Sequence, residues 1–403
     1  MRHVVVVGAS LAGVHAIEGL RDRGYEHEIT LVGAERHLPY TRPPLSKDSL
    51  AGTSDYESLG LRPQEWYDDQ GVRLLLGSPA ASLDARAKQL VTRDGTNVAF
   101  DGLVVATGSS ARTVTPPGAA APVRTLRTID DSMRLREDLV PGQHLAVIGA
   151  GFVGLEIAST ARQLGLDVTV IEMEPAPLTR VLGKAVGSWF RRLHERNGVS
   201  VRCGSRLERV EPTKDGTTLV FDHGERVHAD HVVAGVGAGP AVGWLEGSGV
   251  EVGDGVVCSP DLRTSAPDIV AAGDVARWHH PLFDEEMRIE HWTNAVEQGR
   301  HAAGTLLGDR SAFANVPYFW TDQFDVKARF VGRAHPDDDL IIEREDERSL
   351  VALFGRAGVL RGALCVGSPR LLARYREAIA QRTAWDDCRR AGAPETVASH
   401  CTT

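Results

Sequence analysis

Runs of consecutive hydrophobic residues, each followed at once by small residues, organise this chain. The first run, residues 4–7, consists of four valines and leads into Gly8-Ala9-Ser10-Leu11-Ala12-Gly13, after which residues 14–22 show a helical pattern. An unbroken run of β-branched residues is typical of a parallel strand covered on both faces. Residues 29–32 supply the next strand, so the chain opens with a predicted strand–helix–strand unit.

The same design returns in the middle of the chain. Residues 144–148 form a second hydrophobic run, which is followed by Gly149-Ala150-Gly151-Phe152-Val153-Gly154 and later by a strand at 168–171. Residues 116–122 precede this unit, and their prolines and small residues predict a linker. Because the design occurs twice, it is stronger evidence for two domains of the same kind than either copy would be alone.

Three further runs end in small residues. Residues 101–109 predict a buried strand ending in Ala106-Thr107-Gly108, residues 230–240 one ending around Gly237, and residues 265–276 one that delivers Gly273-Asp274 into a turn. Such endings let the backbone approach a flat ligand, although ordinary strand exits share them. Short strands are also predicted at 72–76 and 90–93, with Ala81 in the turn region between them.

The pattern changes beyond Pro317. Residues 318–327 are rich in aromatic side chains, and antiparallel strands are predicted at 340–342, 350–353 and 359–365. Residues 368–381 predict an arginine-rich helix, and the small polar residues at the end of the chain predict a frayed terminus.

Length, charge and cysteine usage narrow the class of protein. A chain of 403 residues exceeds one ordinary core, so two or three domains are expected. Its net charge of -9 argues against nucleic acid as a partner, and no apolar run approaches the roughly 20 residues of a membrane span. The first predicted strand begins at His3, so we expect no signal peptide. The five cysteines form no C-x-x-C pair, so we expect a cytoplasmic protein with neither a metal site nor disulfides.

The first cradle, residues 8–13, has the residue types that a bound pyrophosphate requires. Gly8 allows a sharp turn, Ser10 keeps the chain small where phosphates approach, and Gly13 lets the helix pack close to the strand. The helix N-terminus then offers free N–H groups to the phosphates. Glu35, just beyond the next strand, is placed to accept a hydrogen bond from a ribose hydroxyl. The alternative is that these small residues only serve packing.

The second cradle, residues 149–154, carries the full G-x-G-x-x-G pattern in Gly149, Gly151 and Gly154. Glu172 closes its second strand, and an acid at that position accepts hydrogen bonds from both ribose hydroxyls and repels a 2′-phosphate. This predicts NADH rather than NADPH, although Arg180 further along the chain weakens the prediction.

A proline-rich loop at residues 39–47 delivers two cations near the first cradle. Its prolines set a stiff turn that presents Arg42 and Lys47. A lysine is usually solvated surface, so a site role and a surface role for Lys47 are both open. Ser46 is interpreted as the cap of a following helix. Asp274 is placed to bind a polyol chain, and a common glycine turn is its alternative.

Together, residues 8–13, 42–47, 106–108, 149–156, 272–274 and 319–323 resemble the FAD-dependent ferredoxin reductases of bacterial oxygenase systems, a family related to apoptosis-inducing factor. The resemblance covers nearly the whole chain. It implies a glutathione-reductase-like α/β fold with two Rossmann-type domains and a C-terminal α+β domain. The implied boundaries are 1–113 and 243–314 for the FAD domain, 114–242 for the NAD domain and 315–403 for the C-terminal domain.

The resemblance also implies site residues. Lys47 and Glu156 become a catalytic ion pair near flavin N5. Ala34 stands where relatives often have an acid, which leaves the ribose contact to Glu35. The implied FAD-binding residues are Gly8, Ser10, Leu11, Ala12, Gly13, Glu35, Arg42, Lys47, Ala81, Ala106, Thr107, Gly108, Arg127, Gly273, Asp274, Trp292 and Trp320. The implied NAD-binding residues are Gly149, Gly151, Phe152, Val153, Gly154, Glu156, Glu172 and Gly237.

The implied activity is transfer of a hydride from NADH to FAD, followed by single electrons to a ferredoxin-type iron–sulfur protein. Disulfide reductases and NADH peroxidases of this architecture need an early cysteine, whereas the first cysteine here is Cys203. An NADH-responsive interaction protein and a reductase of rubredoxin or a small molecule remain as alternatives. An acidic ferredoxin requires a basic patch, for which the candidates are Arg191, Arg192, Arg196, Arg329, Arg333, Arg370, Arg374 and Arg376.

Overall fold

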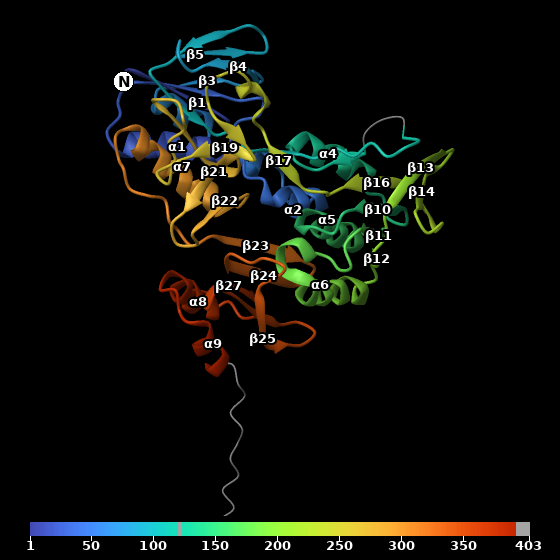
Figure 1. The fold of residues 1–403 in the computed structure, drawn as a ribbon. Coiled ribbons are helices and arrows are strands. Elements are labelled where there is room, and N and C mark those ends of the chain that lie inside the picture. Colours follow the sequence, from blue (N-terminus) through green and yellow to red (C-terminus); the bar gives the residue numbers. More distant parts are fainter. Residues whose placement is uncertain (120–122, 392–403) are drawn as a thin grey trace, which may run out of the picture.

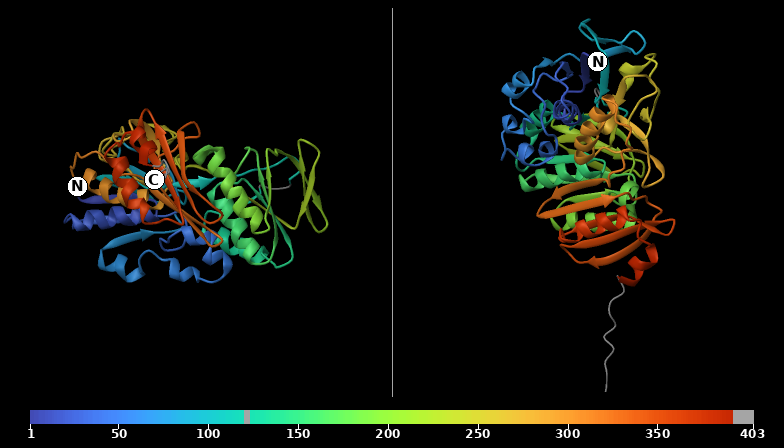
Figure 2. Two further views of the ribbon diagram at one scale, coloured as in Figure 1. Left: turned by 90° about the horizontal axis from the view of Figure 1, so that it is seen from below. Right: turned by 90° about the vertical axis from the view of Figure 1, so that its left-hand side faces the viewer.

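The computed structural model describes residues 1–119 and 123–391. Two α/β units lie side by side, and an orange-to-red C-terminal unit lies below both of them (Figure 1). Seen from below, the C-terminal sheet and helices lie against the N-terminal part, and the green second unit extends to one side (Figure 2). No helix in the described ranges is long and apolar enough to cross a membrane.

The first parallel sheet is built from two distant segments of the chain. Its strand order is β20-β7-β1-β2-β3, so a strand from late in the sequence completes the N-terminal unit. The unbroken valines of β1 are buried on both faces, as their pattern predicts. Helix α1 follows β1 and packs along α7, where a Cβ on Gly19 would lie 2.9 Å from that of Ala303. The bounds are β1 His3–Val7, β2 Glu28–Val32, β3 Val72–Leu75, β7 Gly102–Val105, β20 Ile269–Ala271, α1 Leu11–Asp22 and α7 Trp292–Leu306.

The second parallel sheet repeats the arrangement of the first. Its order is β12-β11-β10-β16-β9, so β10 lies between β11 and β16 just as β1 lies between β2 and β7. In both sheets the strand order reverses beside the strand that leads into the cradle, which is where such folds bind nucleotides. The bounds are β9 Arg124–Thr125, β10 His144–Ile148, β11 Asp167–Glu172, β12 Ser200–Cys203, β16 His231–Ala234, α4 Ile129–Asp138, α5 Phe152–Gln163 and α6 Thr179–Arg196.

The C-terminal unit is an antiparallel sheet of order β23-β24-β27-β26-β25 with α8 packed against it. Its first strand, β23, faces the two nucleotide-binding units in Figure 1. The bounds are β23 Tyr318–Gln323, β24 Val326–Gly332, β25 Asp339–Glu345, β26 Leu350–Arg356, β27 Val359–Val366, α8 Leu371–Ala380 and α9 Trp385–Ala391.

Smaller sheets and short helices connect these units. The smaller strands are β4 Ala80–Asp84, β5 Gln89–Thr92, β6 Asn97–Ala99, β8 Ser109–Ala111, β13 Leu207–Thr213, β14 Gly216–Phe221, β15 Arg226–Ala229, β17 Ala238–Pro240, β18 Val252–Gly253, β19 Gly255–Cys258, β21 Ala276–His280 and β22 Glu285–Arg288. The short helices are η1 Pro43–Ser46, α2 Asp48–Ala51, η2 Tyr56–Leu59, α3 Gln64–Asp69, η3 Gly243–Leu245 and η4 Gly273–Val275. Strands β8 and β17 pair where the chain passes into and out of the second unit.

Several local predictions need correction. The first helix begins at Leu11 rather than at residue 14. Ala81 lies within strand β4 rather than in a turn, at a bulge where the register with β5 shifts between Ala80 and Ser82. The arginine-rich helix is shorter than predicted and begins at Leu371. Residues 120–122 of the predicted linker and residues 392–403 of the predicted frayed end lie outside the described residues. The exact domain boundaries stay a prediction, which the two-segment first sheet supports.

Candidate active site

A cavity of about 310 Å³ opens at the carboxyl ends of the first sheet. All three units contribute to its wall, through the N-termini of α1 and α5, the η1 loop, the ends of β7 and β20, the start of α7, and β23. Its volume lies in the range of roughly 300–1,000 Å³ that is typical of small-molecule and cofactor sites. The predicted site residues that line it are Ser10, Leu11, Ala12, Arg42, Lys47, Ala106, Thr107, Gly108, Arg127, Phe152, Val153, Glu156, Gly273, Asp274, Trp292 and Trp320.

The glycines of the first cradle shape its turn from behind. A Cβ on Gly8 would lie 2.0 Å from the carbonyl oxygen of Ala106, and one on Gly13 would lie 2.1 Å from that of Gly8. Neither glycine lines the cavity. Ser10 is the N-cap of α1, where no described side chain caps the helix, and its first turn holds no acid. The helix therefore presents free N–H groups and its positive dipole end to the cavity.

Gly273, another residue of the cavity wall, lies very close to the start of α1. Gly273 has a φ of +80°, and a Cβ there would lie 2.9 Å from the Cβ of Ala12. Its N–H donates to Oε1 of the buried Gln298 at 2.8 Å. Helix η4 is therefore fixed against the start of α1, with Asp274 facing the cavity.

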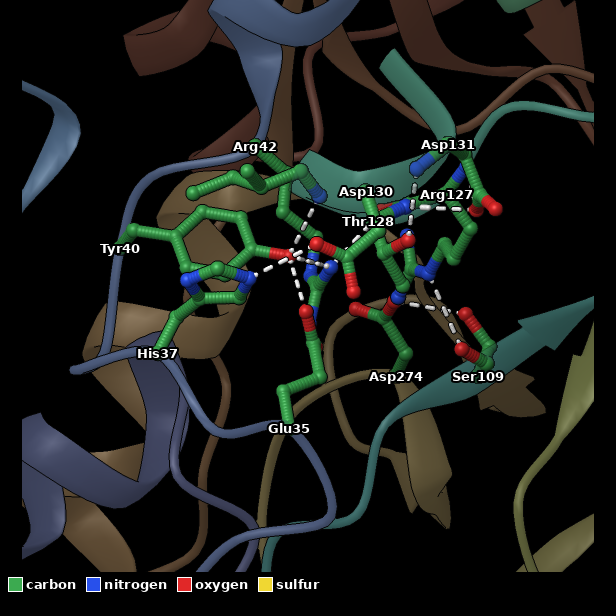
Figure 3. Close-up of polar contacts among 11 residues, drawn as sticks. Glu35, His37, Tyr40, Arg42, Ser109, Arg127, Thr128, Asp130, Asp131 and Asp274 are labelled. Carbon is green, nitrogen blue, oxygen red and sulfur yellow. Dashed lines mark hydrogen bonds and ion pairs between the residues drawn. The ribbon is translucent and has the colours of Figure 1, made fainter. Parts of the chain in front are cut away.

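A hydrogen-bonded network holds Arg42 (Figure 3). Its Nη2 lies 2.7 Å from Oε1 of Glu35, and its Nη1 donates to the Tyr40 hydroxyl at 2.8 Å and to the Arg127 carbonyl at 2.7 Å. The Tyr40 hydroxyl in turn donates to Oε2 of Glu35 at 2.5 Å. Burial raises the pKa of Tyr40, so this hydroxyl keeps its proton. Both oxygens of Glu35 thus accept hydrogen bonds from this network, and Glu35 does not line the cavity, so its ribose contact stays a prediction.

Arg127 and Asp274 form a second part of this network (Figure 3). Oδ2 of Asp274 accepts from the Ser109 hydroxyl at 2.9 Å and from Nη2 of Arg127 at 3.1 Å. Nε of Arg127 donates to the Ser109 carbonyl at 3.0 Å. The cavity therefore meets a cation and a carboxylate that orient one another.

Lys47 and Glu156 form an ion pair inside the cavity. Nζ of Lys47 lies 2.7 Å from Oε2 of Glu156 and donates to the Pro43 carbonyl at 3.1 Å. The Ser46 hydroxyl donates to Oε2 of Glu156 at 2.5 Å, and the Thr321 hydroxyl donates to Oε1 at 2.6 Å. The interpretation of Ser46 as a helix cap is therefore wrong, because α2 begins after Lys47 and the serine hydroxyl is used by Glu156.

Aromatic side chains close the remaining side. Trp292 donates from Nε1 to the Thr41 hydroxyl at 3.1 Å, and its ring centroid lies 6.0 Å from that of Trp320. His291 stands beside them with its ring 4.8 Å from Phe319, and burial lowers its pKa to about 4. Its Nδ1 is buried without a hydrogen-bond partner among the described residues. It is therefore an unpaired polar atom of a neutral imidazole in the wall of the cavity.

The second cradle has the same construction on the second sheet. A Cβ on Gly154 would lie 2.2 Å from the Gly149 carbonyl, whereas one on Gly151 would meet nothing nearer than 3.7 Å. No described side chain caps α5, and Val153 is exposed at its start. Gly237 has a φ of +94° and open space around it. Unlike Phe152, Val153 and Glu156, residues Gly149, Gly151, Gly154, Glu172 and Gly237 do not line the first cavity.

Glu172 is oriented by the backbone at the end of β11. Its Oε2 accepts from the Ala150 N–H at 2.7 Å, and its Oε1 accepts from the Glu174 N–H at 2.9 Å. Arg180 is bound through Nε to Oε1 of Glu174 at 2.8 Å. The arginine that weakened the nucleotide prediction therefore already has an acidic partner.

Ala81 lies on an exposed part of β4 and does not line the cavity, so its site role stays a prediction. Conversely, sequence reasoning assigned no site role to Tyr40, Ser109, His291 or Thr321, nor the role of Ser46 described above. The partners of Ser46, Ser109 and Thr321 lie in segments distant in sequence, whereas Tyr40 contacts the nearby Glu35 and Arg42. The polar residues at buried strand positions 321 and 323 are the detectable signal in the sequence.

These features fit a bound dinucleotide in the first cavity. An uncapped helix N-terminus suits a pyrophosphate, the arginine–aspartate network suits hydroxyl and phosphate groups, and the aromatic wall with the unpartnered Nδ1 of His291 suits a flat ring system. Two cradles of this kind on adjoining sheets, with one helix of the second reaching the cavity of the first, define a two-nucleotide oxidoreductase.

Comparison with known proteins agrees with that class. Residues 2–299 match the pyridine nucleotide-disulphide oxidoreductase family, and residues 318–396 match the domain described as reductase C-terminal. The ferredoxin–NAD(+) reductase component of the anthranilate 1,2-dioxygenase system from Burkholderia cepacia is 36% identical over 88% of this chain and 87% of its own. Rhodocoxin reductase from Rhodococcus erythropolis is 35% identical over 91% of this chain and 87% of its own.

The solved structure of the covalent putidaredoxin reductase–putidaredoxin complex superposes with a TM-score of 0.89 at 33% identity, covering 94% of this chain and 93% of that one. The chain therefore belongs to the pyridine nucleotide-disulphide oxidoreductase family, in the branch of the ferredoxin–NAD(+) reductases. The predicted resemblance and the predicted fold class are confirmed.

Proposed function

We propose that this protein is an NADH-dependent ferredoxin reductase that holds FAD in the first cavity and NADH at the second cradle. FAD, when bound, takes up two electrons as a hydride from NADH and returns them singly, so that one NADH reduces two one-electron acceptors. A [2Fe–2S] ferredoxin that serves an oxygenase is the acceptor that the relatives favour. Free thiols at Cys203, Cys258, Cys365 and Cys388 accord with a cytoplasmic location.

The observation that carries the proposal is the position of Glu156. It lies on α5, the helix that begins at the second cradle, yet its carboxylate lines the cavity of the first. A nucleotide bound along the N-terminus of α5 and a flavin in the cavity would therefore meet near Glu156 and Lys47. Among the described residues that line the cavity there is no cysteine, which argues against thiol-based disulfide or peroxide chemistry.

The residues of the cavity have distinct proposed tasks. Free N–H groups at the start of α1 bind the FAD pyrophosphate, and Arg42, Arg127 and Asp274 orient its hydroxyl and phosphate groups. Trp292 and Trp320 exclude water from the ring system. Lys47 supplies a positive charge that Glu156 holds in place.

Arg329 is a candidate docking arginine whose position in the sheet lies beside the cavity. It pairs with Trp320 in the register of β23 and β24, and Trp320 lines the cavity. Arg191 and Arg192 are bound by Glu195 and Glu345. Nε of Arg333 lies 3.4 Å from Oε1 of Glu285, and Nη2 of Arg376 lies 3.8 Å from Oε1 of Glu297. We therefore place the ferredoxin contact at the edge of the cavity beside Trp320.

Anaerobic stopped-flow reduction of the FAD-loaded protein tests the proposal. We expect NADH to bleach the flavin absorbance far faster than NADPH does, and the reduced protein to pass electrons to a [2Fe–2S] ferredoxin. A protein that binds no FAD after refolding with it contradicts the proposal. Rapid reduction by NADH without any ferredoxin reduction would instead favour a small-molecule acceptor or an NADH-responsive interaction protein.

A further inference from the structure

A chain of buried hydrogen bonds leads from Glu156 away from the cavity. The Thr321 hydroxyl donates to Oε1 of Glu156 at 2.6 Å, Nε2 of Gln323 donates to the Thr321 oxygen at 3.1 Å, and Oε1 of Gln323 lies 2.9 Å from Nε2 of His194. Thr321 and Gln323 are each 1% exposed, His194 is 0% exposed and Glu156 is 6% exposed. Water therefore does not compete for these bonds.

The donors of this chain all point toward Glu156. Because the Gln323 amide nitrogen donates to Thr321, its oxygen must accept, and His194 must carry its proton on Nε2. Burial lowers the pKa of His194 to about 4, so the imidazole is neutral at pH 7 and has one N–H to give. Its Nδ1 is buried without a hydrogen-bond partner in the described part of the chain.

Gln323 determines where the Thr321 proton points. A threonine hydroxyl rotates to suit its surroundings. With a donor already directed at its oxygen from Gln323, the Thr321 proton is left to the Glu156 carboxylate. Chains of this kind also polarise one another in a low-dielectric interior.

The second unit and the C-terminal unit each supply part of the chain. His194 lies on α6, Gln323 and Thr321 lie on β23, and Glu156 lies on α5. Along β23 the buried positions are Phe319, Thr321 and Gln323. Burying a polar group at such a position lowers the stability of the fold unless the group is hydrogen-bonded, and an apolar residue would pack there with a smaller loss of stability.

We propose that Gln323 and His194 are positioning residues that act through Thr321 to hold the Glu156 carboxylate, and through it the Lys47 ammonium, in place at the cavity. This inference rests on the proposed function for its kinetic consequence. Its geometric consequence, the fixed position of Lys47, can be measured in the protein whatever reaction is catalysed.

Gln323→Leu is the variant that tests this proposal, because it keeps a similar side-chain size and removes both hydrogen bonds. We expect flavin reduction at saturating NADH to slow by roughly tenfold, which corresponds to about 1.4 kcal/mol of barrier, with the affinity for NADH unchanged. If this variant does not fold, Thr321→Val carries the test, because it is nearly isosteric and lacks only the hydroxyl. Thr321→Ser should restore most of the rate.

Ser159→Ala is the matched control. The Phe324 N–H donates to the Ser159 hydroxyl at 2.6 Å across the same contact of α5 with the end of β23, and that bond is separate from the chain. We expect this control to lower the melting temperature and to leave the reduction rate unchanged.

A labelling readout separates this inference from the proposed function. With limiting acetic anhydride, modification of Lys47 relative to Lys88 should rise several-fold in Gln323→Leu and Thr321→Val and stay constant in Ser159→Ala, because a loosened Glu156 no longer shields Lys47. A wild-type protein that NADH does not reduce would refute the proposed function, while the labelling would still decide the positioning. If Gln323→Leu and Thr321→Val show the same Lys47-to-Lys88 labelling ratio and the same rate of flavin reduction as Ser159→Ala, the inference is wrong.

Discussion

Nζ of Lys47 lies 2.7 Å from Oε2 of Glu156, and this contact joins the loop of the first nucleotide-binding unit to the cradle helix of the second. Both side chains are largely buried. Their pairing at the cavity wall is the structural basis for placing the two nucleotides against one another.

Lys47→Met should impair both stability and activity. Removing one partner of a buried ion pair leaves an uncompensated charge and costs about 3–5 kcal/mol, so the urea midpoint of the variant should fall. Flavin reduction by NADH should slow by at least roughly tenfold, an amount that corresponds to about 1.4 kcal/mol of barrier. Lys88→Met is the control, since Lys88 pairs with Asp268 at 2.6 Å on the surface. That pair contributes less than about 1 kcal/mol, and equal losses in both variants would contradict the account.

The second and third glycines of the second cradle, Gly151 and Gly154, should respond differently to alanine. In Gly154→Ala the new Cβ meets the Gly149 carbonyl at 2.2 Å, so the variant should unfold at a markedly lower temperature. In Gly151→Ala the nearest atom is 3.7 Å away, so thermal stability should be kept. Its methyl group would occupy space that the nucleotide phosphates need, and the KM for NADH should rise by roughly tenfold, or about 1.4 kcal/mol of binding. An unchanged KM would show that NADH does not bind at this cradle.

Glu172→Gln tests the preference for NADH. The amide keeps an acceptor for the Ala150 N–H but removes the charge that repels a 2′-phosphate. The ratio of kcat/KM for NADH over NADPH should fall by roughly tenfold, or about 1.4 kcal/mol. Glu208→Gln, at an exposed surface position, should leave the ratio unchanged. A ratio that stays constant in Glu172→Gln would remove Glu172 from nucleotide selection.

Much of the fold was predictable because buried parallel strands appear as unbroken hydrophobic runs. The hydrophobic runs at residues 4–7 and 144–148 predicted both parallel sheets, and the small residues after each run predicted the cradles. The bulge at Ala81 was not predictable, because it depends on the register between β4 and β5 rather than on local composition. No local pattern showed that β20 joins the first sheet, and only the family resemblance implied it, through the two segments of the FAD domain.

The site was predictable where a motif fixes the backbone and not where a side chain finds a distant partner. The cradle residues and Lys47 follow from local patterns or from the family resemblance. Ser46 was interpreted as a helix cap, but its hydroxyl donates to Glu156, which belongs to another unit. Thr321 and Gln323 could have been singled out, because strand alternation places them on the buried face with Phe319, where polar residues are unusual.

The acid stability of the protein should depend on His194. Its pKa is lowered from 6.5 to about 4 by burial, so between these values the unfolded chain binds a proton that the folded chain does not. Stability should therefore be lost as the pH falls from about 6.5 to 4. Between pH 7 and pH 4.5, His194→Gln should reduce that loss by about 2 kcal/mol, from about 1.4 kcal/mol per pKa unit. Urea unfolding at pH 7 and pH 4.5 measures it, and parallel pH dependences would contradict the burial of a neutral histidine.

Arg329→Glu tests the docking position beside Trp320. Reversing this charge should slow reduction of an acidic ferredoxin by roughly tenfold, or about 1.4 kcal/mol, and the defect should shrink as salt is added. Turnover of NADH with ferricyanide should be unaffected. Arg191→Glu is the comparison, because Arg191 is already paired with Glu195 at 2.8 Å. Equal losses with ferredoxin and ferricyanide would place Arg329 in the electron path inside the protein rather than at the docking surface.

The central claim is that the protein converts one two-electron donor into two one-electron products. Its most direct test is an anaerobic titration in which a catalytic amount of FAD-loaded protein and an excess of oxidised [2Fe–2S] ferredoxin receive measured additions of NADH. We expect two reduced ferredoxins for each NADH consumed, with little reduction when NADPH replaces NADH. Complete oxidation of NADH with no reduced ferredoxin would contradict the central claim.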